Sequence, residues 1–76
     1  MTEIEWRKKF KDRLSFMMRR ANLTRQDLIE KSDISESALS YYLSGQKTPG
    51  IKTTIALAYA LGCSIEDLVD YGEKIW

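Results

Sequence analysis

Apolar residues recur at helical spacing along almost the whole chain, and no segment alternates with period two for long enough to make a strand. The first expected helix, over residues 2–21, carries one such apolar stripe, made of Phe10, Leu14, Met17, Met18 and Ala21. An amphipathic stripe has to be covered by other elements, and here those elements are helices as well. The pattern therefore predicts an all-α fold, a compact five-helix domain that spans residues 1–76.

Capping and turn residues set the expected boundaries. Thr24 begins a short helix with Asp27 three residues on, as in a capping box, and Ser35 and Ser64 begin later helices. Gly45 and Gly62 each follow a run of helical residues, as C-terminal glycines do. The helices are expected over residues 24–32, 35–44, 51–61 and from 64 to 69 or 71. In the fourth, the apolar residues are expected to cover one broad side of the helix, and they are Ile51, Ile55, Leu57, Ala58 and Leu61.

Composition excludes several classes of protein. The chain of 76 residues has one cysteine and no histidine, so an internal disulfide and a Cys/His zinc site are both excluded. Cys63 is expected to be a small core residue. No apolar run approaches the ~20 residues that span a bilayer, and no secretory signal is visible, so a cytoplasmic protein is expected. No cofactor, metal or small-molecule ligand is expected, and an enzyme is disfavoured because no catalytic constellation appears.

The two segments over residues 24–44 have the proportions of a helix-turn-helix. On the second helix the inward positions are Ile34, Ala38, Leu39, Tyr42 and Leu43. The outward positions are Glu36, Ser37, Ser40, Tyr41 and Ser44. This outward face is polar and small enough to enter a major groove, although it carries no positive charge. The net charge is +1, yet residues 1–20 hold seven basic and three acidic side chains. Such asymmetry marks either a nucleic-acid face or a solvated helix surface.

Three segments in order, "LTRQDLIEKSDIS", "SALSYYLSGQKTP" and "IALAYALGCSIEDL", resemble the lambda-repressor-like (Cro/repressor, XRE-type) helix-turn-helix proteins. The resemblance covers residues 10–68. It implies that the helix over residues 35–44 enters the major groove of double-stranded DNA and that the start of the preceding helix binds a phosphate. The implied base-reading residues are Glu36, Ser37, Ser40 and Tyr41. The expected phosphate-binding residues are Arg25, Ser35, Ser44, Gln46, Lys47 and Lys52.

The chain departs from the family pattern at a charged pair. Many members pair an arginine late in the first helix with a glutamate late in the third, where this sequence has Met18 and Leu43. Replacing both halves of a buried pair with apolar residues is often neutral or stabilising. We therefore expect Met18 and Leu43 to touch in the core, with no buried ion pair there.

The leading hypothesis is a sequence-specific regulator of transcription, most simply a repressor, that works as a weak homodimer formed on DNA. The fifth helix and the tail, residues 72–76, are expected near that dimer interface. The alternative is a protein-interaction module or antitoxin subunit with the same fold, which the low net charge favours. Glu36 has two readings of equal weight. It either accepts a hydrogen bond from a cytosine amino group or only stabilises the first turn of its helix.

Overall fold

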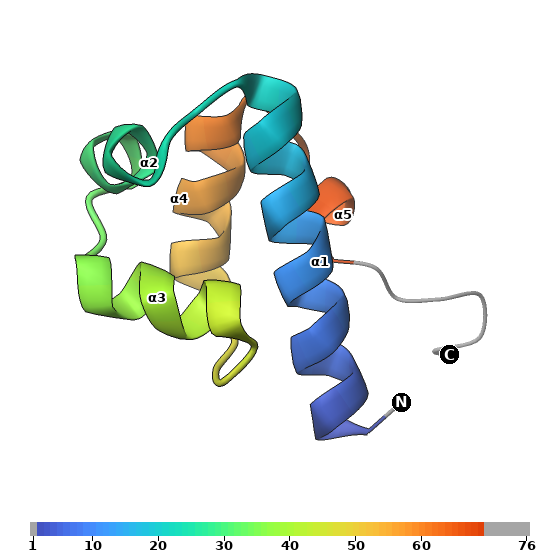
Figure 1. Cartoon of the computed structure of the whole chain (residues 1–76). Helices are drawn as coiled ribbons and strands as arrows, with labels where there is room; N and C mark the ends of the chain where they lie inside the picture. The colour runs from blue at the N-terminus through green and yellow to red at the C-terminus, as the bar shows by residue number, and fades with distance from the viewer. Residues whose placement is uncertain (1, 70–76) are drawn as a thin grey trace.

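The computed structural model describes residues 2–69, and within that range the chain forms five helices and no strand (Figure 1). The helices are α1 (Glu3–Ala21), α2 (Arg25–Ser32), α3 (Glu36–Ser44), α4 (Ile51–Leu61) and α5 (Ile65–Leu68). This confirms the all-α prediction and the first four helices. The last helix is shorter than predicted, because Val69 already has extended backbone angles (φ −108°, ψ 98°). Residue 71, the other predicted end, and the tail of residues 72–76 lie outside the described residues.

The predicted caps explain why the helices begin and end where they do. Thr24 and Asp27 form a reciprocal capping box on α2, and Ser64 forms another with Asp67 on α5. At the C-terminal ends, Asn22 and Asp33 both have φ of 57°, in the left-handed region that these short polar side chains tolerate. Asp33 is the turn between α2 and α3, so this residue sets where α3 starts relative to α2.

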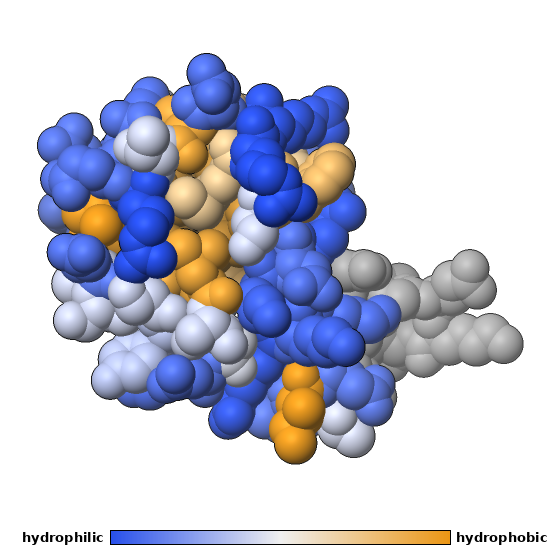
Figure 2. Space-filling view, viewed as in Figure 1, coloured by the Kyte–Doolittle hydropathy of each residue, from blue (hydrophilic) through white to orange (hydrophobic). Residues whose placement is uncertain are grey.

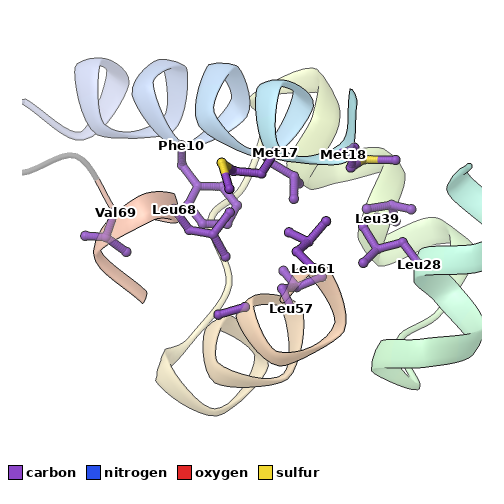
Figure 3. Packing of buried hydrophobic residues seen from close by; sticks show 11 residues of the cluster. Phe10, Met17, Met18, Leu28, Leu39, Leu57, Leu61, Leu68 and Val69 are labelled. Atoms are coloured by element: carbon purple, nitrogen blue, oxygen red, sulfur yellow. The ribbon is translucent and has the colours of Figure 1, made fainter. Parts of the chain in front are cut away.

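The core is one apolar cluster to which all five helices contribute, and Figure 3 shows its side chains pointing toward one another. Its largest fully buried members are Leu14, Leu28, Leu39, Leu57 and Leu68. Helix α1 packs against α3, α4 and α5, while α2 packs against α3 and α4. Leu39 therefore anchors the inward face of α3 while the outward face stays free. Hydrophilic residues cover most of the face seen in Figure 2, with hydrophobic colour gathered near its middle.

The apolar side predicted for α4 is buried only in part. Ile51 is 70% exposed and Ile55 is 50% exposed. The buried residues of this helix are Thr54, Leu57, Ala58 and Leu61. Thr54 can take an inward position because its hydroxyl donates a hydrogen bond of 2.8 Å to the Gly50 carbonyl, which leaves no unpaired polar atom. The spacing of the apolar residues alone did not show which side of α4 faces the core.

The expectation for Met18 and Leu43 is met in part. Met18 is 8% exposed, and Leu43 is half-buried and packs against the cluster. Helices α1 and α3 are in contact, and the salt bridge found within residues 2–69 joins Arg7 to Glu3 inside α1. Direct contact between the Met18 and Leu43 side chains stays a prediction. Cys63 is half-buried against the cluster, where burial raises the pKa of its thiol.

Candidate nucleic-acid interface

The outward face of α3 forms an open hollow of about 500 Å³. Its lining consists of Glu36, Ser37, Ser40, Tyr41, Ser44 and Gln46. All four residues predicted to read bases are in this set, together with two of those predicted to bind phosphates. The side chains offer hydroxyls, an amide and one carboxylate, and none of them is cationic. We refer to this surface below as the α3 hollow.

Arg25 connects α2 to this hollow. It is the first residue of α2, directly after the Thr24 cap, and its Nη2 donates a hydrogen bond to the Ser40 hydroxyl oxygen. The guanidinium therefore lies at one edge of the hollow and shares it with the N-terminus of α2, where backbone N–H groups favour an anion. Ser40 keeps its own O–H as a donor. One hydrogen bond thus joins a predicted phosphate-binding residue to a predicted base-reading residue.

Lys47 reaches the same hollow from the loop after α3. Its Nζ lies 4.4 Å from the centroid of the Tyr41 ring, within cation–π range. The loop is held to α3 by the backbone, because the N–H groups of Gln46 and Lys47 both donate to the Tyr41 carbonyl, over 3.0 and 3.4 Å. Ser44 also donates its hydroxyl to that carbonyl, over 3.1 Å. Two cations, Arg25 and Lys47, are therefore each tied to a residue of the hollow.

Four of the six residues predicted to bind phosphates lie outside the lining of the hollow, namely Arg25 and Lys47, described above, and Ser35 and Lys52. Ser35 is the N-cap of α3, and its hydroxyl oxygen accepts a hydrogen bond of 3.0 Å from the Ala38 N–H. Its O–H stays available as a donor, so capping and phosphate binding are compatible. Lys52 is exposed in the first turn of α4, which follows the loop that carries Lys47.

Lys11 was missed by the sequence analysis. Gly45 ends α3 with φ of 78°, and a Cβ added there would lie 3.2 Å from Cδ of Lys11 in α1. The aliphatic part of Lys11 therefore passes beside Gly45, at the C-terminal end of α3. The only available signal was the excess of basic residues in the first twenty. That excess did not single out Lys11, because seven residues share it and only the packing of α1 against α3 brings Lys11 to Gly45.

Arg13 is structural. Its Nε donates a hydrogen bond of 2.7 Å to the Asp67 carbonyl, which ties α1 to α5. Its guanidinium also lies 5.8 Å from the centroid of the Phe16 ring. These contacts occupy Arg13 on the α5 side of α1, whereas α3 contacts α1 through the segment that holds Lys11.

Asp27, the acidic member of the capping box next to Arg25, is held in its charged form. Hydrogen bonds from the Thr24 backbone N–H and hydroxyl lower the pKa of Asp27, so this carboxylate remains an acceptor at the start of α2. Across residues 2–69, no group of three or more His, Cys, Asp or Glu side chains could hold a metal ion. Within the same range, none of the helices has the length and apolar character needed to cross a membrane.

Comparison with known proteins gives a consistent result. The family model described as a Cro/C1-type helix-turn-helix DNA-binding domain matches residues 13–74. The crystal structure of a transcriptional regulator from Listeria innocua superposes with a TM-score of 0.71 at 30% sequence identity. The match covers 88% of this chain and 63% of that regulator's chain, so this chain spans less than two thirds of its length. No curated protein matches the sequence.

Proposed function

Since the chain belongs to the family of Cro/C1-type helix-turn-helix DNA-binding domains, we propose that it is a sequence-specific regulator of transcription. In this proposal the helix-turn-helix of residues 24–44 places α3 in the major groove of double-stranded DNA. The protein acts as a repressor, because a domain seated in the groove excludes other proteins from the same site. Its place of action is beside DNA in the cytoplasm.

The observation that carries the proposal is the pair of tethered cations at the α3 hollow. Phosphate contacts position a protein on DNA, whereas contacts to base edges specify the sequence. Arg25 and Lys47 supply the first kind of contact, and each is already attached to a base-reading residue, Ser40 or Tyr41. The cations and the proposed reading face are thus in contact within the protein itself.

The four base-reading residues have complementary chemistry. Glu36 accepts from a cytosine amino group, Ser37 and Ser40 donate or accept, and Tyr41 donates its hydroxyl or packs on a thymine methyl group. Tyr41 is 41% exposed and has the Lys47 ammonium over its ring, so part of this side chain is accessible to a partner. Ser35, Ser44 and Gln46 are assigned to the backbone, with Lys52 beyond them on α4.

Selection of bound sites from a pool of random duplex DNA tests the proposal. We expect an enriched site whose preference is lost when Ser37 and Tyr41 are both changed to alanine. Binding to random DNA should weaken steeply with added salt, as counterion release requires. A protein that enriches no site and ignores random DNA at low salt would instead be a protein-interaction module, which the net charge of +1 would suit.

A further inference from the structure

Lys11 of α1 lies against the C-terminal end of α3. A Cβ built on Gly45 would be 3.2 Å from Cδ and 3.9 Å from Cβ of Lys11, so the lysine chain runs beside a residue that has no side chain. Figure 1 shows this end of α3 next to the N-terminal half of α1. The Lys11 ammonium is two single bonds of ~1.5 Å beyond Cδ, so it stays within a few ångströms of the end of α3.

Two arginines of α1 have partners within the protein, whereas Lys11 has no acidic partner among residues 2–69. Arg7 pairs with Glu3 over 3.2 Å, and Arg13 donates to the Asp67 carbonyl. Within that range Arg7–Glu3 is the ion pair that forms, so no carboxylate neutralises the Lys11 ammonium there. Lys11 is half-buried, as expected for a lysine that packs its aliphatic chain and keeps its charged head in water.

The turn that follows α3 carries positive charge and no acid. Residues 37–65 contain no aspartate or glutamate, and Lys47 is two positions beyond Gly45. Lys11 reaches the same turn from α1, thirty-four positions earlier in the chain. Two ammonium groups beside a turn whose own chain has no carboxylate attract an anion.

We propose that Lys11 is a phosphate-binding residue, which holds the DNA backbone at the C-terminal end of α3 while Arg25 holds it beside Ser40. This inference rests on the proposed function and adds α1 to the DNA interface. Gly45 lies five residues beyond Ser40, about 7.5 Å along a helix that rises 1.5 Å per residue. Phosphates recur every ~3.4 Å along each DNA strand, so the two cations engage different phosphates.

A contact from α1 has a distinct effect on how the protein sits on DNA. Helix α1 packs against α3, α4 and α5, so Lys11 is mounted on the core, whereas Lys47 is mounted on a loop. Groups carried by helices are held more precisely than groups carried by loops. Because phosphate contacts set register and orientation, Lys11 fixes the angle at which α3 enters the groove.

Lys11 also has a structural task, from which phosphate binding has to be separated. The last turn of α3 contains no basic residue, and a cation near the C-terminus of a helix offsets its dipole. That task is the same with and without DNA. Losing it lowers the stability of the protein but removes no contact to a phosphate, so the salt dependence of DNA binding distinguishes the two tasks.

Lys11→Met tests the proposal, because methionine keeps an unbranched chain beside Gly45 and removes the charge. Lys9→Met is the matched control: Lys9 is also half-buried on α1, and two positions turn a side chain by about 200° around the helix, away from that of Lys11. Lys11→Arg keeps the charge, and Lys11→Gln removes it with a polar side chain. Urea unfolding followed by circular dichroism measures the stability of each variant.

Fluorescence anisotropy with labelled random duplexes, over a series of salt concentrations, measures the contact. We expect Lys11→Met and Lys11→Gln to lower the slope of log K against log salt concentration by about 0.9, so that their loss of affinity is about 3.5-fold larger at 50 mM than at 200 mM salt. Lys9→Met and Lys11→Arg should leave the slope unchanged.

Replacing single phosphates of an operator duplex with neutral methylphosphonates locates the contact. One replacement should weaken the unaltered protein and have no effect on Lys11→Met. A different replacement should have no effect on Arg25→Ala, because the two cations engage different phosphates. If both variants lose sensitivity at the same phosphate, the proposal is wrong.

Folded Lys11→Met and Lys11→Gln proteins with an unchanged slope would overturn the proposal, even where their stability has fallen, and would leave Lys11 with the helix-dipole task alone. An equal change of slope for Lys9→Met would also overturn it. The proposed function is tested by the unaltered protein. If that protein binds no duplex at low salt, the DNA-binding function fails and the Lys11 contact fails with it. If it binds DNA and only the Lys11 variants show no change, the function stands and this inference fails.

Discussion

Replacing Arg25 with alanine should weaken binding to every DNA sequence and reduce the dependence of binding on salt. Arg25 is exposed at the N-terminus of α2 and lies at the edge of the α3 hollow through its hydrogen bond to Ser40. Its proposed task is to neutralise one phosphate. The variant should fold normally, because Thr24 and Asp27 cap α2 without help from residue 25.

The size of the effect follows from counterion release. Each neutralised phosphate contributes about 0.9 to the slope of log K against log salt concentration. Losing one contact therefore makes the ratio of the two binding constants, unaltered over variant, about 3.5-fold larger at 50 mM salt than at 200 mM. Because the contact is to the backbone, the ratio should be nearly the same on the operator and on random DNA.

Fluorescence anisotropy with labelled duplexes, over a series of salt concentrations, measures both slopes. Lys31→Ala is the matched control, since it removes one positive charge from the last turn of the same helix, at the opposite end from Arg25. An unchanged slope for Arg25→Ala, or an equal change for Lys31→Ala, would refute the phosphate assignment. Ser40→Ala completes the set. It keeps the charge of Arg25, so it should leave the slope unchanged and alter only the preference for the operator.

Three other predictions follow from named contacts. Tyr41→Ala should cost roughly 1–3 kcal/mol on the operator and relax the preference at one or two base pairs, measured by competition among operator variants. It should also weaken random binding slightly, since Lys47 loses the ring beneath it. Leu43→Glu should lower the free energy of unfolding in urea by about 3 kcal/mol, the lower end for an unpaired buried charge, because Leu43 is only half-buried. Asp27→Asn should make the free energy of unfolding depend less on pH in acid. The pKa of Asp27 lies below its ordinary 3.8, so the stability that its carboxylate contributes is present above pH 3.8 and is lost as the pH falls through the lowered pKa.

The helix boundaries were predictable because the signals that set them are local. A capping residue and its partner lie three positions apart, as Thr24 does from Asp27 and Ser64 from Asp67, so both ends of the interaction appear in one short window of sequence. The left-handed turn at Asp33 is set by a single residue in the same way. Such interactions depend little on the rest of the fold.

The orientation of α4 was not predictable on the same grounds. This helix has apolar residues on several sides, so its hydrophobic pattern does not choose one inward face. The choice is made by the neighbours, since α2, α5 and α1 all pack on α4 and leave Ile51 outside. Thr54 is buried instead because its hydroxyl has a backbone acceptor within the same helix.

One part of the candidate site was also predictable from the sequence, and another part was not. The outward face of α3 was predictable from helical period, and its predicted members do line one hollow. The contacts that tie cations to that face were not predictable from the sequence. Arg25 is fifteen positions from Ser40, and Lys11 is thirty-four from Gly45, so their meeting depends on the angles between helices. Those angles are set by the shared core and not by either segment alone.

A reading helix without positive charge has a consequence for how this protein would find its operator. Cations on such a helix raise affinity for any phosphate backbone, and random sites in a genome compete for the protein in proportion to that affinity. Here the charges stand at the edges of the α3 hollow, on Arg25 and Lys47, while Glu36 within it is repelled by misplaced phosphates. A single copy then binds random DNA weakly, and useful affinity has to come from joining two copies. We expect a weak dimer to supply that gain only where two half-sites are correctly spaced, so that discrimination comes from the spacing as well as from the bases.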